Sequence, residues 1–369
     1  MKSNLLLCFL VLIILTACND KTFTEEPIPT GFTEYNCFPW ANFKEWKSED
    51  SPYGLFDVYF VSRRNGWVLM KKDSILNTTN GGKTWTKNYI ETIDPGLNYD
   101  NYHFICVYFI DDFNGWVGAS SNRLYHSTDR GVHWSKTLLF YNVVEGGIYN
   151  IQFTDNQTGW ATLSDEKNTK YLIKTTDAGA TWQIVNSSEV TGYSSLTFVD
   201  KNIAYCFGDY SNNNMKFGAI YKTTDEGISW EKVFSDSSVT FNKIFFINPN
   251  TGWALTKSNK FFKTTDGGET WYIQYFNNNS QIINFTFSDE LNGWLVTGLP
   301  IEITGDSKYY LIYHTDNGGN TWLPLNYWVA LDEPNGIVHF HDLFFFDKDE
   351  GFISGSKGVI LHTTTGGKQ

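Results

Sequence analysis

The chain has 369 residues, of which 41% are hydrophobic and 17% aromatic, and its formal net charge is −12 at pH 7. This acidity argues against a nucleic-acid partner and against binding to anionic lipid surfaces. No Cys/His spacing is typical of a zinc site. The three cysteines that follow Cys18 show no framework spacing, so we expect buried free thiols at Cys37, Cys106 and Cys206 rather than a disulfide scaffold.

The N-terminus has the pattern of a bacterial lipoprotein signal. A short basic start precedes an apolar run, Leu5 to Leu15, that is too short to span a bilayer as a mature helix. Leu15-Thr16-Ala17-Cys18 resembles a lipobox, which predicts a signal peptide over residues 1–17 and acylation of Cys18; an ordinary cleaved secretory signal is the alternative. We expect a lipid-anchored protein of a Gram-negative-type cell envelope, at the outer membrane, with the leaflet left open.

Residues 18–36 are polar and contain two prolines and a glycine, which predicts a flexible tether. The remaining chain, 37–369, carries an eight-residue motif whose fullest copy is Thr264-Thr265-Asp266-Gly267-Gly268-Glu269-Thr270-Trp271. Its six complete copies recur about every 47 residues, a period typical of stacked supersecondary units.

The motif has the chemistry of a turn. Its Asp or Asn accepts hydrogen bonds from backbone N–H groups ahead of it, and the Gly two positions later permits a positive φ. The closing Trp is expected to start a strand and to pack into the core. We therefore predict a structural role for the acid or amide of each copy: Asn80, Asp129, Asp177, Asp225, Asp266 and Asn317.

A second signature marks seven further strands. Each repeat has an aromatic residue in a Gly-Trp-like segment, with Phe always seven positions earlier: Phe60, Phe109, Phe153, Phe198, Phe246, Phe287 and Phe345. The alternation around each Phe predicts an inner strand A, followed by strands B and C, the turn of the eight-residue motif, and strand D. Seven such units predict an all-β, seven-bladed propeller of four-stranded antiparallel blades.

The motif resembles the Asp-box, or BNR, repeat of sialidase-type β-propellers. Together with the Gly-Trp signature, it makes the chain most similar to the photosystem II stability and assembly factor family of seven-bladed propellers, over roughly residues 37–369. This resemblance implies chaperone-like docking onto a protein partner at a membrane. That family uses an arginine-rich patch to meet its partners, whereas this chain has only Arg63, Arg64, Arg123 and Arg130.

The spacing also predicts how the ring closes. The usual offset from the Gly-Trp aromatic to the box Trp, applied to Phe352, falls one position past Gln369, so blade seven lacks its own strand D. We predict that Phe43 to Lys47 supplies this strand.

The site is predicted on the face where the insertions lie. All variation in repeat length falls in B–C and D–A loops, which open on the same face of a propeller. Ten residues before each Gly-Trp aromatic lies a mostly polar set, expected at one depth beside the central channel; polar strand starts around a water-filled channel are the alternative explanation. The predicted binding residues are Asp57, Tyr99, Tyr102, His103, Lys243, Trp328, His339, His341 and Asp342.

The favoured function is a non-enzymatic, membrane-anchored scaffold for a protein partner, with no catalytic residue and no cofactor. His339, His341, Asp342 and Asp57 could form a metal site, but no metal is predicted. A glycan- or polysaccharide-binding lipoprotein is the alternative, because aromatic and acidic linings suit sugars. A glycoside hydrolase with Asp57 and Asp342 as facing acids is less favoured, and a sialidase is not supported because three of the four arginines lie on the opposite face.

Overall fold

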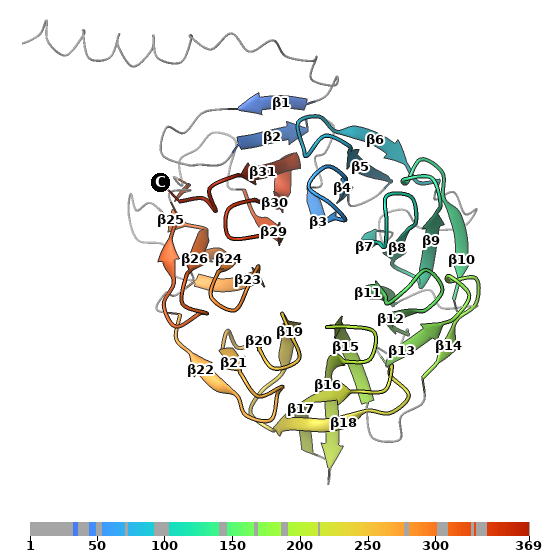
Figure 1. The fold of residues 1–369 in the computed structure, drawn as a ribbon, viewed down its shortest axis with the longest axis vertical. Helices are drawn as coiled ribbons and strands as arrows, with labels where there is room; N and C mark the ends of the chain where they lie inside the picture. Colours follow the sequence, from blue (N-terminus) through green and yellow to red (C-terminus); the bar gives the residue numbers. More distant parts are fainter. Residues whose placement is uncertain are drawn as a thin grey trace, which may run out of the picture. The chain divides into compact units, whose positions relative to one another are not determined.

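Seven antiparallel sheets, six of four strands and one of five, surround a central opening in the computed structural model (Figure 1). The predicted all-β, seven-bladed propeller is therefore confirmed. The described residues are 32–35, 44–48, 54–70, 73–91, 103–139, 146–165, 169–185, 191–212, 215–276, 280–300, 309–325, 328–329 and 338–368. The predicted signal peptide, Cys18, Cys37, Tyr99 and Tyr102 lie outside them.

The strands follow the predicted order A to D in each blade. Blades one to three contain β3 (Leu55–Phe60), β4 (Gly66–Met70), β5 (Ser74–Thr78), β6 (Thr86–Tyr89); β7 (Phe104–Phe109), β8 (Gly115–Ala119), β9 (Arg123–Ser127), β10 (Ser135–Leu138); and β11 (Gly147–Phe153), β12 (Gly159–Ser164), β13 (Lys170–Thr175), β14 (Gln183–Ile184). Blades four to six contain β15 (Thr191–Phe198), β16 (Ala204–Asn212), β17 (Met215–Thr223), β18 (Glu231–Asp236); β19 (Phe241–Phe246), β20 (Gly252–Thr256), β21 (Phe261–Thr264), β22 (Tyr272–Gln274); and β23 (Ser280–Phe287), β24 (Gly293–Pro300), β26 (Ile312–Thr315), β27 (Leu323–Pro324).

Blade seven is built from both ends of the chain. Its inner strands are β29 (Phe340–Phe345), β30 (Gly351–Gly355) and β31 (Val359–Thr363), with a 3-10 turn at Ser356–Gly358. The fourth strand is β2 (Lys44–Ser48), which pairs antiparallel with β31 and so confirms the predicted closure, shifted by one residue. A fifth strand that was not predicted, β1 (Phe32–Tyr35), pairs with β2.

The seams between blades are made by stacked aromatic rings. The Gly-Trp aromatic of each blade lies against the strand A Phe of the next: Trp67 stacks on Phe109 with centroids 3.6 Å apart, and Phe352 stacks on Phe60 at 4.2 Å. The same Phe109 meets the box Trp134 edge-on at 6.1 Å. Each strand A Phe thus carries contacts both within its blade and across a seam, which explains its fixed place in the repeat.

The glycine of the Gly-Trp signature makes room for that Phe. A Cβ added to Gly115 would lie 2.3 Å from the Phe109 ring. Blade four has Ala204 at this position, and there the stack of Trp160 on Phe198 is tilted by 36° with centroids 5.6 Å apart. We attribute the looser stacking of Trp160 on Phe198 to the extra methyl group of Ala204.

The Asp boxes hold turns as predicted. In the box of blade five, the Asp266 carboxylate accepts the Thr270 N–H at 2.9 Å, and Gly268 has a φ of +91°. The other five copies show the same bond from the backbone four residues ahead, at 2.8–3.0 Å. Two details differ from expectation: strand D begins one residue after the box Trp, and of the six box Trp residues only Trp85 and Trp230 are buried.

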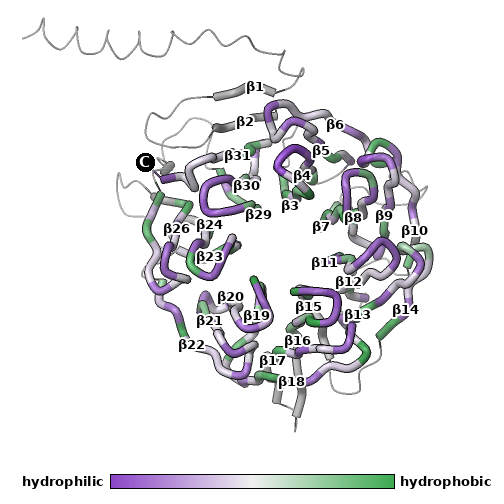
Figure 2. Tube along the Cα trace, in the orientation of Figure 1, coloured by the Kyte–Doolittle hydropathy of each residue, from purple (hydrophilic) through white to green (hydrophobic). Residues whose placement is uncertain are grey.

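The face that carries the A–B turns and the Asp boxes, called the box face below, is polar. The strands that run between the two faces are largely apolar. Figure 2 shows hydrophilic colouring on the turns drawn in front, for example between β3 and β4 and between β29 and β30. The core of each seam is buried and apolar, and the two described cysteines, Cys106 and Cys206, are buried free thiols as predicted. No helix among the described residues has the length and apolar character needed to cross a membrane.

The insertions build additional strand structure on the other face. In blade four, β16 and β17 continue as paired strands to Asn212 and Met215, so most of the B–C insertion lengthens a hairpin. In blade six, β25 (Tyr309–Tyr310) from the B–C connection pairs with β28 (Trp328–Val329) from the following D–A connection. Two separate insertions therefore combine into one small sheet.

Candidate binding channel

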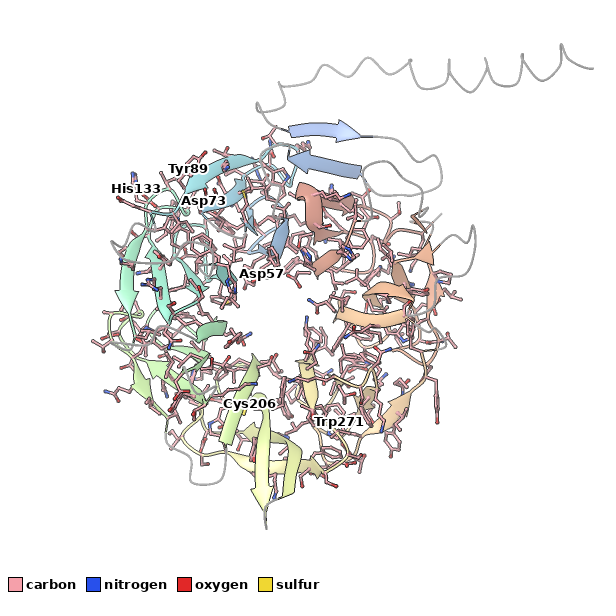
Figure 3. All side chains as sticks on the ribbon, turned by 180° about the vertical axis from the view of Figure 1, so that it is seen from behind. Asp57, Asp73, Tyr89, His133, Cys206 and Trp271 are labelled. Carbon is pink, nitrogen blue, oxygen red and sulfur yellow. The ribbon has the colours of Figure 1, made fainter. Side chains whose placement is uncertain are left out.

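A cavity of about 1010 Å³ occupies the centre of the ring, and Figure 3 places Asp57 at its edge. All seven members of the predicted polar set line this cavity, which confirms the expected common position beside the channel: Asp57, Cys106, Asn150, Ser195, Lys243, Asn284 and Asp342.

A β-bulge precedes every member of this set. In all seven A–B pairs the register shifts between the start of strand A and the polar residue, for example between Leu55 and Asp57 and between Phe241 and Lys243. A bulge bends the strand and redirects a side chain. It also adds lining residues that the sequence analysis missed: Phe56, Ile105, Tyr149, Asn242 and Ile283.

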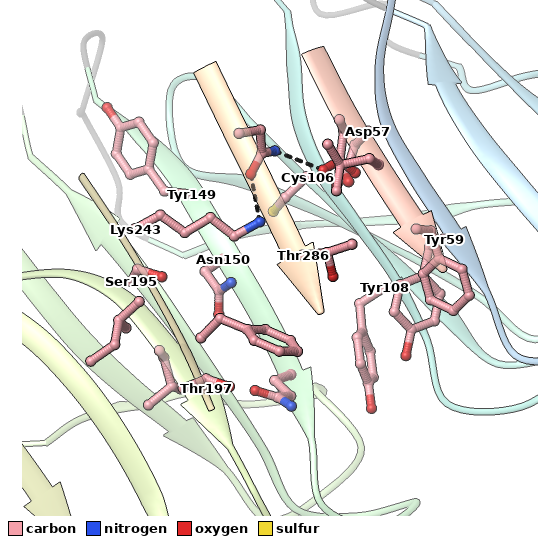
Figure 4. A pocket seen from close by; sticks show the side chains of 18 of the residues that line it. Asp57, Tyr59, Cys106, Tyr108, Tyr149, Asn150, Ser195, Thr197, Lys243 and Thr286 are labelled. Carbon is pink, nitrogen blue, oxygen red and sulfur yellow. Dashed lines mark hydrogen bonds between the residues drawn. The ribbon is translucent and has the colours of Figure 1, made fainter. Parts of the chain in front are cut away.

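Much of the polar ring ties one blade to the next. Asp342 Oδ2 accepts the Val58 N–H at 3.0 Å, and Asp57 Oδ2 accepts the Val107 N–H at 2.7 Å. Asn284 donates to Asp342 Oδ1 at 2.8 Å and accepts from Lys243 Nζ at 2.6 Å (Figure 4). These bonds run without a break from blade five through blades six, seven and one to blade two.

The environment changes the protonation of these groups. Burial raises the pKa of Asp57 well above its usual value, and the neighbouring Asp342 adds to this; the Val107 N–H and Lys243 act in the opposite direction. Burial lowers the pKa of Lys243, against the influence of Asp342 and Asp57. Asp57 and Lys243 each expose one side to the channel while protein surrounds their other sides. Burial also raises the pKa of the Cys106 thiol.

The two acids that line the channel have structural partners in the adjacent blades. Asp57 accepts the Val107 N–H and Asp342 accepts the Val58 N–H, so each carboxylate holds the backbone of the next blade. No arginine is among the described residues that line the channel. Arg63 instead forms ion pairs with Asp347 and Glu350 in an A–B turn.

The remaining predicted binding residues are not gathered at the channel. The Nδ1–H of His341 donates to the Leu55 carbonyl at 2.8 Å and the ring stacks on Phe56, so His341 joins blade seven to blade one. The backbone N–H groups of His103 and His339 donate to Ser120 and Ser356, and neither residue belongs to the described lining. Within the described ranges, no group of three or more His, Cys, Asp or Glu residues could hold a metal ion.

Trp328 is described through its backbone in β28 only, and Tyr99 and Tyr102 lie outside the described residues. Of the nine predicted binding residues, the structure thus brings Asp57, Lys243 and Asp342 together. Whether they bind a ligand stays a prediction.

The fold and its turns define the class: the protein is a seven-bladed Asp-box β-propeller. A family model described as "Photosynthesis system II assembly factor YCF48" matches residues 38–197. Photosystem II stability/assembly factor HCF136 of Guillardia theta is 34% identical over 71 residues, a segment that covers 18% of each chain. The predicted resemblance to this assembly-factor family is confirmed.

Solved structures support the fold over most of the chain. A structure titled "YCF48 bound to D1 peptide" is 20% identical with a TM-score of 0.62, and covers 89% of this chain and 99% of that one. YCF48 from Cyanidioschyzon merolae is also 20% identical with a TM-score of 0.62, covering 87% and 98%. At this identity the likeness concerns the fold.

Proposed function

We propose that this chain is a non-enzymatic scaffold that binds a protein partner through the face carrying its B–C and D–A loops. The observation that carries the proposal is the pairing of β25 with β28, in which insertions from two different connections join into one element. Drift in two independent loops gives no reason for such a pairing. The likeness to YCF48, one structure of which contains a D1 peptide, supports a protein partner.

The proposal includes an anchor. Acylation at Cys18 and a tether would hold the propeller at the outer membrane of the cell envelope. Substitution of Cys18 by Ser should abolish incorporation of labelled palmitate and should move the protein from the membrane fraction to the soluble fraction. An unchanged membrane fraction would show that the anchor is wrong, without bearing on the scaffold.

The scaffold is tested by crosslinking and affinity purification from native cells. The loop-face variant carries Ala at Tyr99, Tyr102 and Trp328; the control variant carries Ala at three exposed residues of the box face, Phe113, Ile228 and Leu291. We expect an envelope protein to be captured by the wild type and the control but lost from the loop-face variant. Equal capture by all three would contradict the proposed face. Capture of no protein by the wild type would favour the polysaccharide alternative.

A further inference from the structure

The outer strand of blade five has a free edge. β22 is the last strand of its sheet, where it pairs antiparallel with β21, and no described strand pairs with its other side. Figure 1 shows β22 on the outer rim of the ring. The backbone N–H and C=O groups on the outer side of such a strand are available to a further strand. The ring itself shows this mode of pairing, because β1 adds to the outer strand of blade seven.

The side chains of β22 are unusual for an exposed edge. Tyr272, Ile273 and Tyr275 have 61%, 47% and 74% of their surface exposed. The run from Tyr272 to Phe276 contains no charged residue and no proline. Proteins usually protect an exposed edge with lysine or proline, which hinder pairing with another strand. β22 lacks this protection.

The other outer strands are protected or less apolar. β2 is covered by β1. Four more strands contain a lysine or a proline: Lys87 in β6, Lys136 in β10, Lys232 in β18 and Pro324 in β27. β14 is also uncharged, but it is two residues long, and its exposed large apolar side chain is Ile184, at 40%. Among the described outer strands, β22 is therefore the one best suited to accept a further strand.

We propose that this edge pairs with the same edge of a second copy of the chain, so that two β22 strands lie antiparallel across a two-fold axis. An isologous interface needs a patch that complements itself. Opposite residues of an antiparallel pair must both direct their backbone groups at the partner strand or both direct them away, so the axis passes through a residue. With the axis at Gln274, Ile273 of each copy lies opposite Tyr275 of the other. Aromatic–β-branched pairs of this kind stabilise antiparallel strands.

The charge and the area of the edge define the kind of dimer. Self-pairing of β22 places no like charges opposite each other, although two copies of net charge −12 repel at longer range. The exposed side chains and the strand backbone bury on the order of 400 Å² per copy. Stable interfaces bury about 1,200–2,000 Å² in total, so this dimer is weak and reversible. The proposal does not depend on the scaffold function, because it concerns the outer rim and not the loops.

Sedimentation velocity of the full-length chain measures this association. We expect a shift from monomer to dimer as the concentration rises, and tighter association at higher salt, because salt screens the repulsion between two acidic copies. I273K should raise the dissociation constant by about tenfold or more, since each dimer then holds two unpaired charges at an uncharged edge. The control I184K makes the same change on β14 and should leave the association unchanged.

A crosslink tests the register. With the axis at Gln274, the two copies of this residue lie directly opposite each other, at a Cα separation that suits a disulfide. Q274C should therefore form a disulfide-linked dimer on mild oxidation. The matched change on β14, Q183C, should form no more of it than the wild type does with its own cysteines.

Four results would overturn the proposal. A wild type that stays monomeric at every concentration would exclude the second copy and leave the edge to a strand of another protein. Equal association of I273K and the wild type, or an equal loss in I184K, would place the contact elsewhere on the molecule. Association that weakens with salt would assign it to ion pairs. Equal yields of oxidised dimer from Q274C and Q183C would reject the paired edges.

Discussion

The two faces of this propeller differ in how much the lengths of their connections vary. On the box face, all A–B turns and Asp boxes keep the same length, and side chains bond across the seams: Trp67 Nε1 donates to the Arg130 carbonyl and Trp253 Nε1 to the Gly318 carbonyl, both at 3.0 Å. The other face carries every insertion, including the β16–β17 extension and the β25–β28 sheet. The comparison teaches that the turns of the box face keep their length where they bond across the seams, whereas the loops of the other face can vary.

Removal of the closing strand should have the largest effect on this arrangement. Deletion of residues 37–50 removes β2, leaving β31 without its outer partner and β1 without a sheet. We expect the melting temperature of the propeller to fall by roughly 10 °C or more, as for a loss of several kcal/mol in a chain of this size. A control deletion of residues 19–30 should melt like the wild type. If the two deletions melt alike, the closure does not stabilise the ring.

The next largest effect is expected at a seam. Phe109 is fully buried between Trp67 and Trp134, so F109A should cost about 3–5 kcal/mol in the free energy of unfolding. Phe113 lies four residues further along, in the A–B turn, and is 50% exposed. F113A should change stability by less than about 0.5 kcal/mol. Chemical denaturation of both variants measures the contrast, and similar losses would refute the stacking argument.

Lowering the pH should reduce the stability of the propeller through His314, which lies beside a seam. This buried histidine lies against Trp294, and burial lowers its pKa to about 4. Between pH 6.5 and 4 the unfolded chain binds the proton more readily, so stability is lost as the pH falls, by on the order of 3 kcal/mol. H314Q should remove this part of the pH dependence, whereas H133Q, at a histidine with an 85% exposed side chain, should leave most of it. Identical pH profiles for wild type and H314Q would exclude the effect.

Substitutions at the glycine of the Gly-Trp signature test whether the strand A Phe requires a residue without a side chain there. In G115A the new Cβ meets the Phe109 ring, and the displaced ring should cost about 1–3 kcal/mol. The reverse change, A204G, relieves the same contact in blade four, so its cost should be smaller despite the added backbone freedom. Thermal melts of both variants decide the matter. Equal losses would show that the Phe position does not explain the glycine.

The smallest effect is expected in a single box. D225A removes the acceptor of the Ser229 N–H and should cost about 1 kcal/mol, whereas D225N should cost less because Asn80 and Asn317 serve the same role elsewhere. Hydrogen bonds lower the pKa of Asp225 to about 2. Its contribution should therefore persist at neutral pH and be lost as the pH falls from about 4 to about 2. A loss for D225N as large as that for D225A would contradict this account.

The features that sequence could predict are those that repeat with residue identity. Phe at a fixed distance from each Gly-Trp aromatic indicated strand A, and the same count placed Asp57, Lys243 and Asp342 beside the channel. The bulges were missed because the bulged positions share no residue type: Phe56, Ile105, Tyr149, Asn242 and Ile283.

Spacing alone also could not show what an insertion becomes. The extra residues of blade four extend β16 and β17, because their backbone groups can pair with each other. An insertion of the same length in another loop need not form paired strands. Nor could spacing distinguish Asn284, which is bonded to the next blade, from Asn150, whose amide oxygen has no partner among the described residues. That difference depends on which atoms the adjacent blade presents.

The shared origin of blade seven has a consequence for biosynthesis. β2 is translated early, and its partner β31 is among the later parts of the chain to leave the ribosome. Six blades can form in order on the nascent chain, but the circle is completed only after Val359–Thr363 has emerged. A truncated product would therefore keep an open seam between its first and last blades, where quality-control proteases could recognise it.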